Sequence, residues 1–374
     1  MMKISKTFTD YALNMPGWRT NREIVVIESD DWGMVRMASR AARARLQSKG
    51  HHIKKSIYNT FDAIACNKDI EHLAEVLDSV KDSQGRPAKF TLNTVMANPD
   101  FERIEAENYH QYFYEPFPQT LSSYPDSDSV LSLLQQGIKN GVFQPQFHGR
   151  EHVQINNWLK QLQSRNKTFM DAFQERMFTL KPPQGFACRA ECLDAMATYQ
   201  IEDFTIVKDS IREGLTLFEK IWGFPSQSLI APCYTWHRNL EPQMASLGIR
   251  YLQGARAQRE PQIRQEKKKI RRHFMGQQST YGIRYLIRNV HFEQARNSHK
   301  DWIDAALNEI RVAFRMRKPA IISSHRVNYI GRLDPDNRNK NLRFLKELLD
   351  SIVKYYPSVE FMSTDELGDL MTKS

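Results

Sequence analysis

The chain has 374 residues, with 53 basic and 43 acidic side chains and a formal net charge of +10, which favours anionic surroundings but specifies no chemistry. This length can bury one large core, and four cysteines are too few for a disulfide scaffold and suit a reducing compartment. No run of about 18 apolar residues exists, and residues 1–18 lack the apolar segment of a signal peptide, so we expect a soluble, cytoplasmic protein without a membrane span.

Two residue patterns recur along the chain. Apolar and β-branched runs bounded by polar, proline or glycine residues predict strands at 24–27, 90–96, 143–147, 204–207, 228–231, 249–252, 285–290, 320–324 and 359–362. Apolar residues at helical spacing predict helices at 37–47, 70–77, 129–140, 211–222, 239–247, 302–316 and 341–355. Strands that alternate with helices in this way must be parallel, so the pattern predicts an α/β fold that closes, or nearly closes, into a barrel.

Two stretches break the alternation and predict insertions into a single domain that spans residues 1–374. Residues 97–126 carry aromatic side chains without a clean period, and such residues more often form a small core of their own than a platform for a sugar. Residues 255–280 contain a basic run at 267–272, which favours a solvated excursion. No aromatic residues alternate with these charges as nucleic-acid stacking requires, so we expect no nucleic-acid partner.

Two aspartates follow the first predicted strand. The run from Ile24 to Ile27 has the composition of a strand buried on both faces, and Asp30 and Asp31 lie at its end. The carboxyl ends of parallel strands are where α/β folds collect ligands and catalytic groups. Adjacent carboxylates repel each other, so two ionised ones need a cation or a strong set of donors. An Asp-Asp turn that caps the next helix would explain the pair equally well.

Histidines lie at two more predicted strand ends. A helix that begins at or just after His148 would place His148 and His152 on one face, where both can bind one ion. The strand at 320–324 delivers His325 to its carboxyl end. A barrel would bring these side chains close to Asp31. Two imidazoles and one carboxylate fill three coordination positions of a divalent ion and leave others open for water and a carbonyl oxygen.

The order of these motifs resembles that of the metal-dependent polysaccharide deacetylases of carbohydrate esterase family 4. The series consists of Asp30-Asp31, a His-x-x-x-His pair, a strand that leads into Pro232 and a strand that ends in Ser324-His325. The resemblance covers about residues 22–370 and implies the family's distorted (β/α)7 barrel, here with insertions. It also implies a hydrolase that removes an acyl group, most often N-acetyl, from a carbohydrate or glycoconjugate, and so acts on a non-peptide carbon–nitrogen bond.

The resemblance also assigns chemical roles. Asp31, His148 and His152 correspond to the metal ligands, Asp30 to the general base and His325 to the general acid. The expected cofactor is one divalent ion, zinc first, although the same ligand set suits iron, cobalt, nickel and manganese.

A further loop and three aromatic residues complete the predicted site. The loop after Pro232 resembles the one whose backbone N–H supports the oxyanion, and that donor is either Cys233 or Tyr234. A sugar ring would find apolar faces in Trp32, Tyr234 and Trp236.

The sequence departs from the family pattern at four motifs, and in the last of them Ser323 stands where a leucine is usual before the histidine. Glu28-Ser29 stands where Thr-Phe is usual, and the fourth motif is present at most as Asp301-Trp302. The arginine that opens the third motif and orients the general base is absent. Arg326 or Arg150 could replace it from elsewhere in the chain.

Other functions fit parts of the same pattern. A relative that kept the barrel but only binds carbohydrate would hold metal without hydrolysis. A glycoside hydrolase or a non-haem iron enzyme with a 2-His-1-carboxylate site also remains, although the latter usually has an all-β fold. Cys188 and Cys192 lack a second cysteine pair for zinc and are expected to be buried thiols. The sequence leaves the oligomeric state open.

Overall fold

The computed structural model describes residues 6–180, 189–263, 269–297 and 299–373. Its centre is a parallel sheet of nine strands: β1 (Ile24–Trp32), β2 (Phe90–Thr94), β5 (Phe143–Phe147), β6 (Ser228–Ile230), β7 (Tyr251–Gly254), β10 (Arg284–Ile287), β11 (Val290–His291), β12 (Ala320–His325) and β13 (Glu360–Met362). Two small antiparallel sheets lie apart from it, and they are formed by β3 (Ala97–Pro99) with β4 (Tyr114–Pro116) and by β8 (Ala257–Glu260) with β9 (Lys269–Arg272).

Helices connect these strands. The α-helices are α1 (Lys6–Asn14), α2 (Arg40–Ser48), α3 (Ile57–Phe61), α4 (Asn67–Asp78), α5 (Phe101–Ala106), α6 (Phe117–Ser122), α7 (Val130–Lys139), α8 (Ile155–Gln163), α9 (Lys167–Gln174), α10 (Asp203–Trp222), α11 (Glu241–Ser246), α12 (Trp302–Arg315), α13 (Pro335–Tyr355) and α14 (Thr364–Lys373). Shorter 3₁₀ turns are η1 (Ile53–Lys55), η2 (Arg189–Cys192), η3 (Pro232–Tyr234), η4 (Arg238–Leu240), η5 (Gln294–Arg296) and η6 (Arg326–Asn328).

The sheet curls because two strands that are consecutive in the chain lie at its opposite ends. The strand order is β10-β7-β6-β5-β2-β1-β12-β11, and β13 pairs with the first residues of β1. Only Arg288 and Asn289 separate β10 from β11, although these two strands stand at opposite ends of the order. The strand predicted at 285–290 is therefore two short strands with a break between them. The predicted α/β barrel is confirmed.

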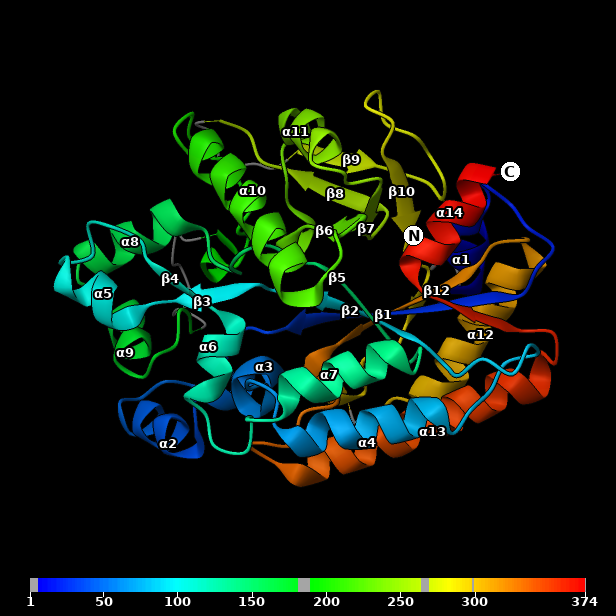
Figure 1. Cartoon of the computed structure of the whole chain (residues 1–374), viewed down its shortest axis with the longest axis horizontal. Coiled ribbons are helices and arrows are strands. Elements are labelled where there is room, and N and C mark those ends of the chain that lie inside the picture. Colours follow the sequence, from blue (N-terminus) through cyan, green and yellow to red (C-terminus); the bar gives the residue numbers. More distant parts are fainter. Residues whose placement is uncertain (1–5, 181–188, 264–268, 298, 374) are drawn as a thin grey trace, which may run out of the picture.

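Helices cover the outside of this sheet on two sides (Figure 1). In that view α4, α7 and α13 lie below the strands and α10 lies above them. The β-branched run of β1 is buried along its whole length and belongs to the main apolar cluster, as expected for a central strand of a parallel sheet. This core fixes the strand ends that carry the polar residues.

A second, smaller apolar cluster lies at the carboxyl ends of β1 and β2, where it packs Met34 and Val95 against residues of α5, α8 and α9. Tyr109 belongs to this cluster, and Tyr112 and Phe113 pack against it. The aromatic residues of the first predicted insertion thus contribute to a small core, as expected.

The hairpin β8–β9 lies within the second predicted insertion. Part of the predicted basic run, including Lys267 and Lys268, lies outside the described residues. In the part of the chain that is described, no helix is both long and apolar enough to cross a membrane.

The predictions for residues 204–207 and for Cys192 are wrong. Residues 204–207 are helical and belong to α10, because Val207, Ile211 and Phe218 continue one buried stripe at helical spacing. Cys192 is disulfide-bonded and is not a buried thiol, while Cys188 lies outside the described residues. The cysteines therefore no longer favour a reducing compartment, and the cytoplasmic location stays a prediction.

Candidate active site

A local irregularity at the end of β1 directs the side chains of two neighbouring aspartates into the same cavity. Successive side chains of a regular strand point to opposite faces. Here the pairing of β1 with β2 shifts register between Ser29 and Trp32, and Asp31 has a left-handed backbone with φ of 76°. Such bulges re-aim side chains. As a result, Asp30 and Asp31 both line a cavity of about 160 Å³.

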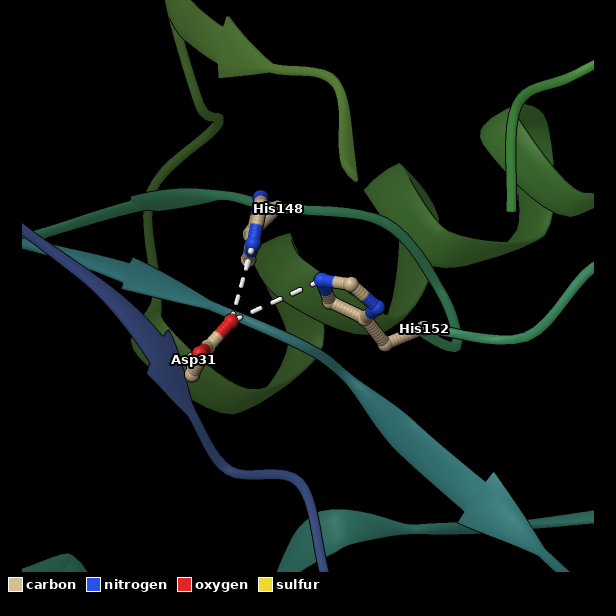
Figure 2. Close-up of side chains that lie close together, drawn as sticks. All are labelled: Asp31, His148 and His152. Atoms are coloured by element: carbon tan, nitrogen blue, oxygen red, sulfur yellow. Dashed lines mark ion pairs between the residues drawn. The ribbon is translucent and has the colours of Figure 1, made fainter. Parts of the chain in front are cut away.

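Asp31 and two histidines meet in this cavity (Figure 2). The Oδ1 atom of Asp31 lies 3.4 Å from Nε2 of His148 and 3.5 Å from Nε2 of His152. One ligand-type atom from each residue lies within 4.8 Å of the other two, and all three side chains are buried. The three residues predicted as a metal site therefore come together.

A turn, and not a helix, places the two histidines. Helix α8 begins only at Ile155, so the helix considered for residues from His148 onward does not form at the histidines. Gly149 has φ of 106°, and the backbone around it bonds to the segment after β2, with Met96 N–H donating to the Gly149 carbonyl. This left-handed glycine reverses the chain and sets the two imidazole rings 5.0 Å apart between centroids.

The hydrogen bond of His148 and the neutral ring of His152 fit a divalent cation. Nδ1 of His148 lies 2.9 Å from the Ile230 carbonyl, to which only an N–H can donate, and this bond directs Nε2 of His148 toward Asp31. Burial lowers the pKa of His152 to about 4, more than the neighbouring Asp31 raises it, so this ring is neutral at pH 7. Neutral imidazoles and an ionised carboxylate are the forms that bind metal.

Asp30 is held as a carboxylate by an arginine that the sequence motifs did not reveal. Arg288 donates from Nη2 to Oδ1 at 2.6 Å and from Nη1 to Oδ2 at 2.7 Å, and Asn93 donates to Oδ1 at 2.7 Å. Burial favours the neutral acid, but Arg288 outweighs it and lowers the pKa of Asp30 to about 2. Asp30 therefore remains ionised at neutral pH.

The two arginines proposed from the sequence do not approach Asp30. Arg150 pairs with Glu151 and Glu213, and Arg326 pairs with Asp62. Arg288 has the position expected of the arginine that orients Asp30, because it lies in the break between β10 and β11, inside the barrel. The only signal for it in the sequence is a charged residue inside an apolar strand pattern.

Glu28 explains part of the departure in the first motif. Its Oε2 accepts a 2.6 Å bond from Nε of Arg288, and its Oε1 accepts a bond from the Thr364 hydroxyl. The carboxylate is fully buried. Glu28 thus fixes the far side of the same guanidinium that holds Asp30.

His325 ends β12 on the other side of Asp30. Its Nε2 lies 3.7 Å from Oδ2 of Asp30, and its Nδ1 bonds to Oε1 of Glu293. Asn328 donates to the second oxygen of Glu293 and orients it. Burial lowers the pKa of His325, but Glu293 outweighs burial, and the net shift is well above the ordinary value. The imidazole is therefore protonated at neutral pH.

Glu293 is a second residue that the sequence motifs missed. The predicted fourth motif, Asp301-Trp302, lies elsewhere, because the Asp301 side chain caps α12 by accepting a bond from the backbone of Asp304. No spacing rule marked Glu293, which follows β11 and faces His325 across the end of the neighbouring strand.

The loop after β6 lines the cavity with Cys233 and Tyr234. Both have left-handed backbones, with φ of 56° and 53°. The Tyr234 N–H donates to the Ala231 carbonyl at 2.9 Å, and its hydroxyl oxygen lies 3.3 Å from Nη1 of Arg288. The Tyr234 backbone donor is therefore engaged within the loop.

Two of the three predicted sugar-binding aromatics do not line the cavity. Trp32 is 3% exposed and donates to the Ser29 hydroxyl, and Trp236 is 2% exposed and donates to Glu241. Both indoles bury their apolar faces in the core and bond their N–H groups there, so neither presents the apolar face that was predicted for a sugar. Of the three, Tyr234 lines the cavity.

No protein-family profile matches the sequence, and no curated protein matches it. Among solved structures, a protein described as a glycoside hydrolase/deacetylase from Parabacteroides distasonis has a TM-score of 0.50 and 8% identity, over 95% of this chain and 72% of that one. A polysaccharide deacetylase structure from Mycobacterium smegmatis has a TM-score of 0.42 and 10% identity, over 96% and 93%. A 4-alpha-glucanotransferase from Thermococcus litoralis has a TM-score of 0.45 and 11% identity. The match covers 92% of this chain but only 40% of the length of that protein. At such identities the likeness concerns the fold, and the chain has the barrel of the glycoside hydrolase/deacetylase structure.

Proposed function

We propose that the protein is a metal-dependent hydrolase that removes an acyl group, most often N-acetyl, from a carbohydrate or glycoconjugate. The observation that carries the proposal is the meeting of three metal-ligand side chains with one ionised carboxylate and one protonated imidazole in a single cavity. Neither the carboxylate nor the imidazole is a predicted ligand, so both remain available for proton transfer.

In this proposal Asp31, His148 and His152 hold the ion, with zinc expected first. When bound, a divalent ion would polarise the acyl carbonyl and make a water molecule more acidic. The other steps fall to residues of the chain.

Asp30 acts as the general base in this proposal. Its Oδ1 already accepts bonds from Arg288 and Asn93, whereas Oδ2 accepts one bond and faces the cavity toward His325. Oδ2 can therefore take the proton that the attacking water loses. The two donors from Arg288 keep the carboxylate in one orientation, which places this oxygen correctly.

His325 acts as the general acid. Glu293 accepts from Nδ1, so the proton on Nε2 is the one that can pass to the leaving nitrogen or oxygen. A backbone N–H of the loop after β6 supports the oxyanion. The donor is the N–H of Cys233 or of Tyr234, and the latter also bonds the Ala231 carbonyl.

Acetate release from N-acetylated sugars tests the proposal. The metal-loaded protein should release acetate, while Asp30→Asn should keep its ion and lose turnover. A protein that binds metal and sugar tightly but releases no acetate from any acylated sugar would instead be a carbohydrate-binding relative.

A further inference from the structure

One cation of the cavity has no role in the chemistry above. Arg36 lies in the segment between β1 and α2, lines the same cavity as Asp31 and His152, and is 4% exposed. Within the described ranges its guanidinium makes no hydrogen bond, and its buried Nε has no partner. The nearest carboxylate oxygen belongs to Glu191, 3.8 Å from Nη2.

Such a guanidinium is unusual in a protein interior. Arginine carries five N–H donors, and a buried charge is costly unless it is paired and hydrogen-bonded. Three other buried arginines near the site obey this rule: Arg288 bonds Glu28 and Asp30, Arg326 bonds Asp62 and the Met34 carbonyl, and Arg150 bonds Glu151 and Glu213. Within the described ranges, Arg36 alone among the four makes no side-chain hydrogen bond, and its one ion pair is the long contact with Glu191.

The position of Arg36 relates it to the reacting groups. Its guanidinium carbon lies 5.6 Å from the centre of the Tyr58 ring, and the same ring makes an edge contact of 5.7 Å with the ring of His325. Tyr58 therefore links Arg36 to the proposed general acid. A group that binds Arg36 would occupy the same cavity as the acyl group.

We propose that Arg36 binds an anionic group of the substrate, so that the enzyme acts on acidic acylated sugars. This inference rests on the proposed function for the acyl sugar, but the anion site itself does not depend on turnover. A guanidinium fork matches the oxygens of a carboxylate or a phosphate in two parallel bonds. The net charge of +10 attracts such substrates over longer distances.

Binding to the metal-loaded protein tests this site with three matched probes: neutral N-acetylglucosamine, N-acetylglucosamine 1-phosphate and N-acetylglucosaminuronate. We expect at least one charged probe to bind about tenfold more tightly than the neutral one in calorimetry, the effect of one hydrogen bond to a charged group. The tighter of the two identifies the anion as phosphate or carboxylate.

Variants assign the preference to Arg36. Arg36→Met should make the protein bind the charged and neutral probes with equal affinity. Arg36→Lys should reduce the ratio of the two affinities, because lysine keeps the charge but loses the fork. Arg40→Met is the matched control: it removes the same charge from an exposed arginine, whose Nε bonds the Leu333 carbonyl, and should keep the ratio. Thermal unfolding and metal content establish that each variant is folded.

Three results decide the matter. Equal affinity of the wild type for all three probes overturns the anion site, even if Arg36→Met fails to fold. Free acetate is measured in the same way: if its affinity depends on Arg36 while the charged sugars bind no more tightly than the neutral one, the residue serves the released acyl product and the proposal is wrong. Selective binding without acetate release from any probe keeps the anion site and rejects the hydrolase.

Discussion

Arg288 and Glu28 form an ion pair inside the barrel, with Nε and Oε2 2.6 Å apart and both side chains no more than 1% exposed. The remaining nitrogens of this guanidinium bind Asp30. One arginine thus fixes two acidic residues of the same strand, and it ties the proposed general base to the stability of the fold.

The first prediction concerns this pair. Arg288→Met leaves Glu28 without a counter-charge and removes the hydrogen-bonded one from Asp30, and loss of one partner of a buried pair costs roughly 3–5 kcal/mol. We expect a decrease of this size in the free energy of unfolding, measured in denaturant with metal present. Restoring charge balance in Glu28→Gln/Arg288→Met should recover part of the loss. A double variant as unstable as the sum of the single ones would contradict a coupled pair.

The second prediction separates the two aspartates. Asp31→Ala and His148→Ala should lose the bound ion, whereas Asp30→Asn should retain it, because only the first two residues belong to the proposed ligand set. Elemental analysis of the purified proteins measures the ion. His110→Ala, at an exposed position outside the site, is the control. Loss of metal from Asp30→Asn would mean that Asp30 is a ligand and not the base.

Sequence motifs found the residues that are proposed to react but not those that hold them. Asp31, His148 and His325 could be predicted because each closes a strand, and strand ends of a parallel barrel share one edge. Arg288 and Glu293 were missed because each contacts a residue of another strand that lies far away in the sequence. No local pattern records such a contact.

The aromatic residues show a different limit. Trp32 and Trp236 stand beside site residues in the sequence, yet their side chains are buried in the core. The bulge at Asp31 accounts for the burial of Trp32, because one extra residue in a strand reverses the face of the sheet to which the next side chain points. A bulge of this kind leaves no clear mark in an apolar sequence run.

The third prediction concerns pH. In the proposed mechanism, turnover needs ionised Asp30 and protonated His325. The pKa of Asp30 is lowered to about 2 by Arg288 against the effect of burial, so Asp30 is ionised at neutral pH. The pKa of His325 is raised because Glu293 outweighs burial, so activity should fall only when alkaline pH removes that proton. Glu293→Gln removes the charge and should move the alkaline limb of kcat to lower pH, toward the ordinary value of 6.5.

The pH profile of kcat for Glu293→Gln checks this shift directly. Asn328→Ala is the matched control, because it loosens Glu293 without removing its charge and should move the limb less. An unchanged alkaline limb in Glu293→Gln would show that another group titrates there.

The last prediction tests whether His325 donates the proton. His325→Ala should lower turnover of an N-acetylated sugar by roughly 10²–10⁴-fold, the usual contribution of a general acid, and should leave the metal content unchanged. An amine leaves poorly without a proton, whereas a phenolate leaves well without one. The loss should therefore be much smaller when the same variant hydrolyses phenyl acetate, with acetate release as the common measurement. Full activity of His325→Ala on the N-acetylated sugar would end the assignment, and an equally large loss on both substrates would mean that His325 positions other groups instead of donating a proton.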